Sequence, residues 1–233
     1  PDPETPAKIV GAATHTAVFE PELYASKYVE APQCMEATGK GEQCSRSASV
    51  AREEPPSKRD AEPVADYWWY CSQHDPWSGG DSAFTGPVVL SQAEAAEVDR
   101  AARAVRGHPA FHDLEARAMG PRELTVVWTD PATGVRCKSR FDMPLEEGIF
   151  DLKTTTDASI DAIRKAVERF MYGFQGAFYL RAAQVAGLED VLNFYLGFVE
   201  KPEPNGVQIV RLHPHSVDAE IDRLNRLLLL WRK

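Results

Sequence analysis

The spacing of apolar residues divides the chain into helical and extended segments. Helices are predicted where apolar residues recur three and four positions apart, over residues 7–20, 91–106, 109–118, 158–186 and 216–232. Strands are predicted where apolar and polar residues alternate or an apolar run is short, over residues 123–130, 135–143, 149–155, 191–200 and 207–212. This order of elements indicates an α/β fold in which helices flank a mixed sheet.

Local signals define how these segments begin and connect. Ser91 and Glu94 form the S-x-x-E pattern of a capping box, which places a helix start at that point. Turn residues at 130–134 and 144–148 separate the strands between residues 123 and 155. We therefore expect these strands to form an antiparallel meander.

Composition and charge narrow the function classes. Hydrophobic residues make up 43% of the 233 residues, which is enough for a folded core. The net charge of −9 counts against a general nucleic-acid coat protein but not against a nuclease, since carboxylates that hold a divalent metal are themselves acidic. The sequence contains no apolar run long enough to span a membrane and no signal peptide, so we expect a cytoplasmic protein.

Residues 31–87 differ in composition from the rest of the chain. They are rich in proline and contain three of the four cysteines, and residues 46–62 show neither helical nor strand periodicity. We interpret this stretch as an insertion into one domain formed by residues 1–30 and 88–233.

The insertion contains a candidate zinc site. Cys34, Cys44, Cys71 and His74 are spaced as C-x9-C-x26-C-x2-H, which is similar to small treble-clef or knuckle-type zinc modules. Four such ligands would fill a tetrahedral zinc ion and leave no open position, so the predicted role is structural rather than catalytic. The alternative is a set of unrelated reduced thiols in a loop.

The predicted strands bring three ionisable residues together. Residues two apart in a strand face the same side, so Asp151 and Lys153 point together while Leu152 points into the core. Asp142 can converge on them from the neighbouring strand. Two carboxylates and an ammonium group suit phosphodiester hydrolysis with bound Mg²⁺ or Mn²⁺. A cross-strand ion pair on a solvated face is the alternative.

Together with the surrounding motifs, these residues resemble the PDDEXK (restriction-endonuclease-like) nuclease superfamily, and within it the RecE-like, or exonuclease VIII-like, phage recombination exonucleases. The resemblance covers residues 7–30 and 91–231. It is carried by R-F-D ending at Asp142, by D-L-K at 151–153, by Y-G-F-Q-G-A-F-Y at 172–179, and by G-A-A-T-H-T-A-V-F-E-P beginning at Gly11.

The resemblance implies a ligand set and catalytic roles. His15, Asp142, Asp151 and the backbone carbonyl of Leu152 would hold the catalytic metal. Lys153 would orient the attacking water, and Gln175 would support the site. The implied activity is Mg²⁺-dependent 5′→3′ digestion of linear double-stranded DNA in phage-type recombination by single-strand annealing. It also implies a ring-like homo-oligomer, a single-strand annealing protein as partner, and a phage or prophage origin in a bacterial host.

Three residues keep a second interpretation. His15 on an apolar helix is also typical of a buried core histidine. Glu20 could cap the helix or form an ion pair near the break at Pro21, and Glu123 has a similarly ambiguous position.

Candidate DNA contacts lie beside the carboxylates. Arg136, Lys138 and Arg140 alternate along one strand and so share a face, which predicts a phosphate-tracking surface or, alternatively, a solvated strand face. Tyr172 and Tyr179 share a helix face with Gln175 and are predicted to contact DNA. Two other functions stay open: a structure- or site-specific endonuclease on the same fold, and a non-catalytic interaction module derived from a nuclease.

Overall fold

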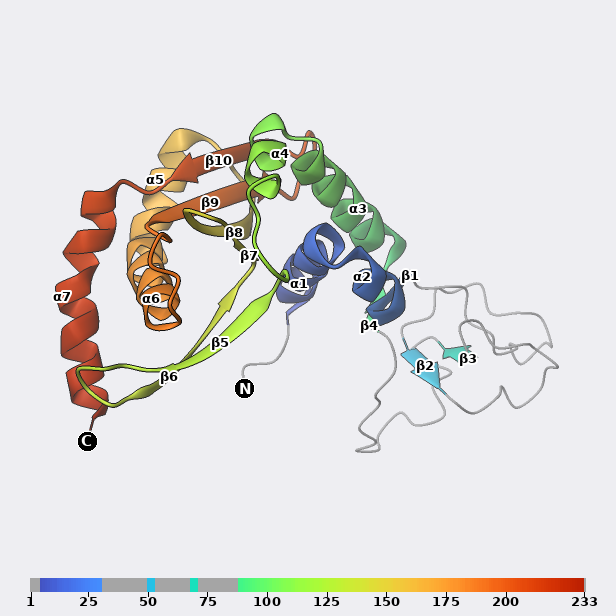
Figure 1. The fold of residues 1–233 in the computed structure, drawn as a ribbon. Coiled ribbons are helices and arrows are strands. Elements are labelled where there is room, and N and C mark those ends of the chain that lie inside the picture. Colours follow the sequence, from blue (N-terminus) through green and yellow to red (C-terminus); the bar gives the residue numbers. More distant parts are fainter. Residues whose placement is uncertain (1–4, 31–49, 53–67, 71–87, 233) are drawn as a thin grey trace, which may run out of the picture. The chain divides into compact units, whose positions relative to one another are not determined.

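The computed structural model describes residues 5–30, 50–52, 68–70 and 88–232. The chain divides into two compact units (Figure 1). The first comprises residues 1–17 and 21–99, and the second comprises residues 18–20 and 100–233.

The first unit contains short helices and short paired strands. Its elements are α1 (Pro6–Phe19, of which the last two residues belong to the second unit), α2 (Pro21–Lys27), β1 (Tyr28–Glu30), β2 (Val50–Arg52), β3 (Trp68–Tyr70), β4 (Val88–Leu90) and the beginning of α3 (Gln92–Arg106). β1 pairs with β4 in parallel, and β2 pairs with β3 antiparallel. The predicted capping box is confirmed, because the Ser91 backbone N–H donates to Glu94 Oε2 over 2.9 Å.

The second unit is built around a mixed sheet. Its elements after α3 are α4 (Pro109–Glu115), β5 (Leu124–Thr129), β6 (Arg136–Phe141), β7 (Met143–Pro144), β8 (Gly148–Thr155), α5 (Ile160–Arg169), α6 (Tyr172–Val185), β9 (Asn193–Glu200), β10 (Val207–Arg211) and α7 (Pro214–Trp231). Four strands form a sheet in the order β10-β9-β8-β7, with β8 and β9 parallel and the other pairs antiparallel. The predicted α/β class with a mixed sheet is confirmed.

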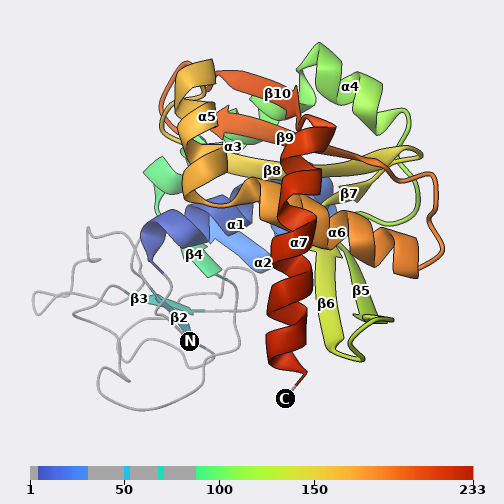
Figure 2. The same cartoon turned by 90° about the vertical axis from the view of Figure 1, so that its left-hand side faces the viewer.

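Helices cover one face of this sheet. α5 and α6 lie against it, and α7 packs on the outside of α6 (Figure 2). The apolar core between these layers includes Ile149, Phe194, Ile163 and Leu180, all of which are buried. Because α6 packs on the sheet through this core, its polar residues that face the strands lie close to the strands.

The other face of the sheet is covered by aromatic packing. Phe150 of β8 contacts Phe111 of α4 with ring centroids 5.6 Å apart, and it contacts Phe19 with centroids 6.3 Å apart. Alternation along the strand therefore places Phe150 on one side of β8 and its neighbours Ile149 and Asp151 on the other.

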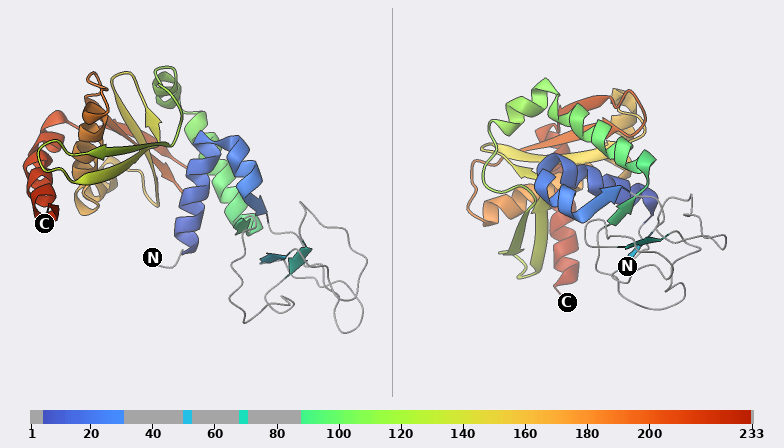
Figure 3. Two further views of the ribbon diagram at one scale, coloured as in Figure 1. Left: turned by 60° about the horizontal axis from the view of Figure 1, so that its bottom comes forward. Right: turned by 90° about the vertical axis from the view of Figure 1, so that its right-hand side faces the viewer.

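The predicted meander is divided in two. β5 and β6 form their own two-stranded ribbon, and among the described residues it is β7, not β6, that pairs with β8. The chain bends at Asp142 between β6 and β7, which ends the pairing with β5 and turns the chain into the central sheet. The ribbon runs beside α7 (Figures 2 and 3).

A buried ion pair fixes the far end of this ribbon. Asp130, which follows β5 and is fully buried, lies 2.5 Å from the Arg181 guanidinium of α6. Arg181 also donates to Asn225 Oδ1 of α7 over 2.6 Å. The carboxylate of Asp130 accepts two further bonds from Thr133, so the ribbon turn is tied to both helices.

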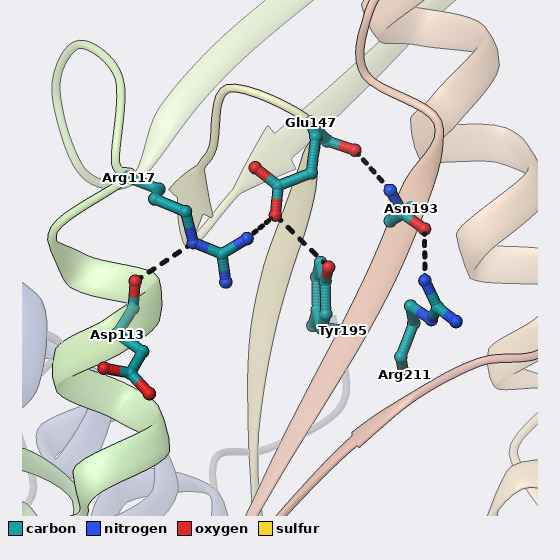
Figure 4. Close-up of polar contacts among 6 residues, drawn as sticks. All are labelled: Asp113, Arg117, Glu147, Asn193, Tyr195 and Arg211. Carbon is teal, nitrogen blue, oxygen red and sulfur yellow. Dashed lines mark hydrogen bonds and ion pairs between the residues drawn. The ribbon is translucent and has the colours of Figure 1, made fainter.

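A second polar network holds the turn between β7 and β8 (Figure 4). The carboxylate of Glu147 pairs with Arg117 and accepts a hydrogen bond from the Tyr195 hydroxyl over 3.2 Å. The backbone carbonyl of Glu147 accepts from the Asn193 side chain over 2.9 Å, and the Asn193 side chain in turn accepts from Arg211. These contacts fix the start of β8 against the start of β9.

Candidate active site

β8 places a carboxylate and an ammonium group on the same side of the sheet. Asp151 is 2% exposed, and its Oδ2 lies 2.5 Å from the Nζ of Lys153. Leu152 between them is fully buried on the opposite face. The alternation predicted from the sequence is therefore confirmed at these three positions.

Asp142 reaches the same site from the bend between β6 and β7. The residue is only 7% exposed, and its Oδ2 accepts a hydrogen bond from the Leu152 backbone N–H over 2.7 Å. β7 pairs with β8 at Met143 and Pro144. The carboxylate of Asp142 therefore contacts β8 just beyond the last of these main-chain pairs.

Burial changes the proton affinity of both carboxylates. Burial raises the pKa of Asp142 well above its usual range, the negative charge of Asp151 raises it further, and the Leu152 N–H opposes the change. Burial also raises the pKa of Asp151, although the ammonium of Lys153 and a hydrogen bond from Gln175 oppose it. Two like charges in a buried site are costly without a cation, so this pair suits a divalent metal.

Lys153 is held as a charged group. Burial alone would lower its pKa, but the charge and hydrogen bond of Asp151, together with the charges of Asp142 and Tyr172, oppose burial, and the net change raises the pKa. The ammonium also lies 5.0 Å from the centre of the Tyr172 ring, a cation–π contact at the start of α6. Lys153 therefore stays protonated and directed at the carboxylates.

α6 contributes Gln175, whose side-chain amide donates to Asp151 Oδ1 over 2.8 Å. Because Lys153 contacts Oδ2, both oxygens of Asp151 have a partner. The neighbouring Gly176 allows this approach, since a Cβ there would lie 3.0 Å from the ring of Phe194 in β9. The close packing of α6 on the sheet thus brings Gln175 to the carboxylate.

Glu123 joins the site, although the sequence left its role open. It precedes β5, and the pairing of Leu124 with Phe141 places it opposite Asp142. Its backbone N–H donates to the Asp142 carbonyl over 2.9 Å, and one carboxylate oxygen of each residue lies within 4.8 Å of the other. Its φ of 53° is in the left-handed region, which is uncommon for glutamate. The hairpin register was the signal in the sequence that could have placed it.

Arg140 of β6 contacts two acidic residues at this site. Its Nε lies 2.6 Å from Glu123 Oε2, and its terminal nitrogen lies 3.9 Å from Glu20 Oε2. Burial raises the pKa of Glu123, Arg140 opposes this, and the charges of Glu20 and Asp151 add to it. The ion-pair interpretation of Glu20 is therefore the one that the structure supports.

The charges of the site leave an excess of carboxylates. Four acidic residues gather there, and two cationic residues face them: Glu20, Glu123, Asp142 and Asp151 against Arg140 and Lys153. Hard divalent cations such as Mg²⁺ and Mn²⁺ prefer carboxylate oxygens. The donor set therefore fits the metal that the sequence predicts.

Several predicted ligands stay predictions. His15 lies on α1 in the first unit, and its role as a ligand stays a prediction, as does that of the backbone carbonyl of Leu152. The proposed zinc ligands Cys34, Cys44, Cys71 and His74 all lie outside the described residues.

The predicted DNA contacts divide into exposed and half-buried groups. Arg136, Lys138 and Arg140 are all exposed and alternate along β6, as predicted. Tyr172 and Tyr179 are half-buried; burial raises the pKa of both. Tyr179 packs 5.2 Å from the Phe141 ring. Both tyrosines thus have packing partners within the protein, and their contact with DNA stays a prediction.

Two hollows in the second unit lie away from these carboxylates. One of about 650 Å³ is lined by α6 and α7, and one of about 840 Å³ is lined by α5, β10 and α7. Neither is lined by a carboxylate of the site. In the described part of the chain no helix is both long and apolar enough to cross a membrane.

Comparison with known proteins assigns a family to most of the second unit. Residues 82–231 match the family described as "PDDEXK-like domain of unknown function (DUF3799)", which is more than half of the chain. Nothing among the curated proteins matches the sequence.

Solved structures give more distant similarities. A crystal structure of a "Putative exonuclease" from Eubacterium rectale is 15% identical over 63% of this chain and 55% of its own, with a TM-score of 0.47. The crystal structure of SSO0001 is 14% identical over 60% of this chain and 65% of its own, with a TM-score of 0.32. The chain thus spans less than two thirds of either protein.

Proposed function

This chain belongs to the PDDEXK-like family, and from that premise we propose that it is a divalent-metal-dependent deoxyribonuclease that digests linear double-stranded DNA from its ends. The observation that carries the proposal is the environment of Asp151. Its two carboxylate oxygens contact Lys153 and Gln175, and it lies beside the buried Asp142. A carboxylate pair with an ammonium group at one edge suits hydrolysis of a phosphodiester.

The residues divide the chemical work. Asp142 and Asp151 would hold the cation, which supplies charge neutralisation at the scissile phosphate and acidifies water. The Lys153 ammonium orients the attacking water and stabilises charge on the phosphate as the new P–O bond forms. The attacking water gives its proton to solvent as this bond forms. The bond to the leaving sugar oxygen then breaks, and that oxygen takes a proton from solvent. Gln175 keeps Asp151 in its orientation throughout.

Finer aspects of this function rest on the sequence resemblance. They include 5′→3′ polarity, a role in phage-type recombination by single-strand annealing, a ring-like homo-oligomer and an annealing protein as partner. His15 as a further metal ligand and the Leu152 carbonyl as another rest on the same support. Cytoplasmic action in a bacterial host belongs to this set.

A structural zinc ion in residues 31–87 is a separate part of the proposal. Its support is the spacing of Cys34, Cys44, Cys71 and His74 and the polar, proline-rich composition of that stretch. The proposed role is to stabilise the insertion.

The decisive experiment compares two forms of duplex DNA. We expect Mg²⁺-dependent loss of linear DNA, survival of closed circular DNA, and no loss of either with Asp151→Asn. Cleavage of closed circles would identify an endonuclease instead. Intact linear DNA with both Mg²⁺ and Mn²⁺ would contradict nuclease activity and favour a non-catalytic interaction module.

A further inference from the structure

Arg140 is positioned to bind two kinds of anion, the carboxylates of the site and a DNA phosphate. Its guanidinium lies 2.6 Å from Glu123 and 3.9 Å from Glu20, yet its side chain is 56% exposed. The side chain of Glu123 is only 10% exposed. Arg140 therefore reaches from the exposed face of β6 toward carboxylates that are largely withdrawn from solvent.

The same residue ends the exposed basic row of the ribbon. Arg136 and Lys138 point to the side of β6 that Arg140 shares, and this row leads to Asp142 two residues further on. Positive side chains along a strand are typical contacts for a DNA backbone. Of the three, Arg140 lies nearest to Asp142 in the strand, and its guanidinium contacts the carboxylates of Glu123 and Glu20.

One guanidinium cannot fully serve both partners. Its planar fork of donors binds a carboxylate or a phosphate, and moving between them changes which anion is neutralised. Arg140 forms an ion pair with Glu123, a largely buried acid close to Asp142. A divalent cation at the carboxylates would supply that positive charge instead.

We propose that Arg140 is a phosphate-binding residue held back by Glu123 and Glu20 until a divalent cation occupies the carboxylate site. This inference rests on the proposed function, since it assumes that the site takes both metal and DNA. Metal binding then releases Arg140 to the DNA backbone, and the protein holds its substrate more tightly when it is ready to cut.

Thermodynamic linkage determines how metal binding and DNA binding affect each other. If metal raises the affinity for DNA, then DNA raises the affinity for metal by the same factor. Couplings between sites are roughly 5- to 150-fold in affinity, and a single exchanged guanidinium belongs near the lower end. Without DNA, the positive charge of Arg140 beside Glu123 repels a cation at the neighbouring Asp142, so removing Arg140 strengthens metal binding.

The first experiment measures DNA affinity with and without a cation. A labelled duplex oligonucleotide is titrated with protein in Ca²⁺ and in EDTA, and a denaturing gel checks that the oligonucleotide stays intact. We expect Ca²⁺ to tighten binding by roughly fivefold or more in the wild type. Arg140→Met removes this gain, whereas the matched control Lys138→Met weakens binding by a similar factor in both conditions.

A second variant tests the restraint from the other side. Glu123→Gln removes the acidic partner of Arg140 while keeping the size of the side chain. We expect this variant to bind DNA in EDTA more tightly than the wild type does and to respond less to Ca²⁺. Thermal unfolding of each variant verifies that it is folded.

A metal titration without DNA separates this inference from the proposed function. Calorimetry with Mn²⁺ is expected to show tighter binding by Arg140→Met than by the wild type, and little change for Lys138→Met. If no variant binds DNA while Mn²⁺ still binds more tightly to Arg140→Met, the DNA-processing function is wrong and the phosphate role falls with it. If Arg140→Met weakens DNA binding equally in Ca²⁺ and EDTA and leaves Mn²⁺ binding unchanged, Arg140 is an ordinary phosphate contact and the inference is overturned.

Discussion

The backbone amide of Leu152 donates to the side chain of Asp142 over 2.7 Å, so a carboxylate joins two segments at a point beyond the pairing of β7 with β8. The bond fixes the orientation of the Asp142 carboxylate. Preorganisation of this kind lowers the reorganisation needed when a metal and a phosphate arrive.

Lys153 gives the most direct test of the chemistry. We expect Lys153→Met to lower the cleavage rate by roughly 10²- to 10³-fold, because the variant loses the only cation in contact with Asp151 Oδ2 among the described residues. The measurement is the rate of linear-duplex digestion in Mg²⁺. Lys165→Met, on the exposed side of α5, serves as the control and should digest DNA at the wild-type rate.

DNA binding by Lys153→Met in Ca²⁺ should stay close to that of the wild type. A variant that cuts at nearly the wild-type rate would remove Lys153 from the mechanism.

Asp142 links the active site to stability and pH. Its folded-state pKa is raised above the unfolded value of 3.8, chiefly by burial, so the folded protein binds this proton more tightly than the unfolded chain does. In the absence of metal, the free energy of unfolding should therefore fall as the pH rises above 3.8 through the raised pKa. Asp142→Asn removes this loss and keeps an oxygen acceptor for the Leu152 amide.

We expect Asp142→Asn to raise the melting temperature in EDTA at pH 7 by a few degrees, since about 1 kcal/mol corresponds to roughly 2–4 °C for a protein of this size. It should also abolish cleavage. Asp161→Asn, at an exposed position on α5, is the control. A lower melting temperature for Asp142→Asn than for the wild type would contradict the assigned electrostatic cost.

The sequence predicts those parts of the site that depend on local geometry. The common face of Asp151 and Lys153 follows from strand alternation, and the capping box at Ser91 follows from a local pattern of hydrogen bonds. Both need only the conformation of a few consecutive residues. The packing of Gln175 on Asp151 depends on tertiary structure, and here the family resemblance supplied what periodicity alone does not.

The sequence does not reveal where pairing ends. A continuous alternating pattern runs through residues 135–143, yet the chain bends at Asp142 and divides the meander between the ribbon and the sheet. The bend depends on contacts with β8, which are distant in sequence. The sequence does not reveal the partner of Arg140 for the same reason. The alternating pattern of an exposed basic row is the same whether or not a buried acid lies beside the strand.

The zinc proposal has its own test, because it concerns residues that the structure does not describe. We expect purified protein to contain one zinc ion per chain by elemental analysis, and Cys71→Ser to lower both the zinc content and the melting temperature. Cys137→Ser is the matched control, since Cys137 is a half-buried residue of β6 in the other unit. One zinc per chain in Cys71→Ser would show that the predicted ligand set is wrong.

Substitution of Glu147 should lower the stability of the sheet without changing the chemistry of the active site. Glu147→Ala loses the ion pair with Arg117 and the hydrogen bond from Tyr195 (Figure 4). Both contacts are only partly buried, so the expected cost is about 1–2 kcal/mol, which lowers the melting temperature by roughly 2–8 °C. Glu147→Gln keeps an acceptor for the tyrosine hydroxyl and should lose less.

Neither Glu147 variant should change the affinity for Mn²⁺ or the cleavage rate well below the melting temperature. The backbone carbonyl of Glu147 still accepts from the Asn193 side chain and from the backbone amides of Leu192 and Asn193, so the start of β8 keeps its anchor. Calorimetry and digestion assays at 25 °C check this. A weaker Mn²⁺ affinity at an unchanged fold would instead mean that the Arg117 contact sets the position of β8, and through it that of Asp151.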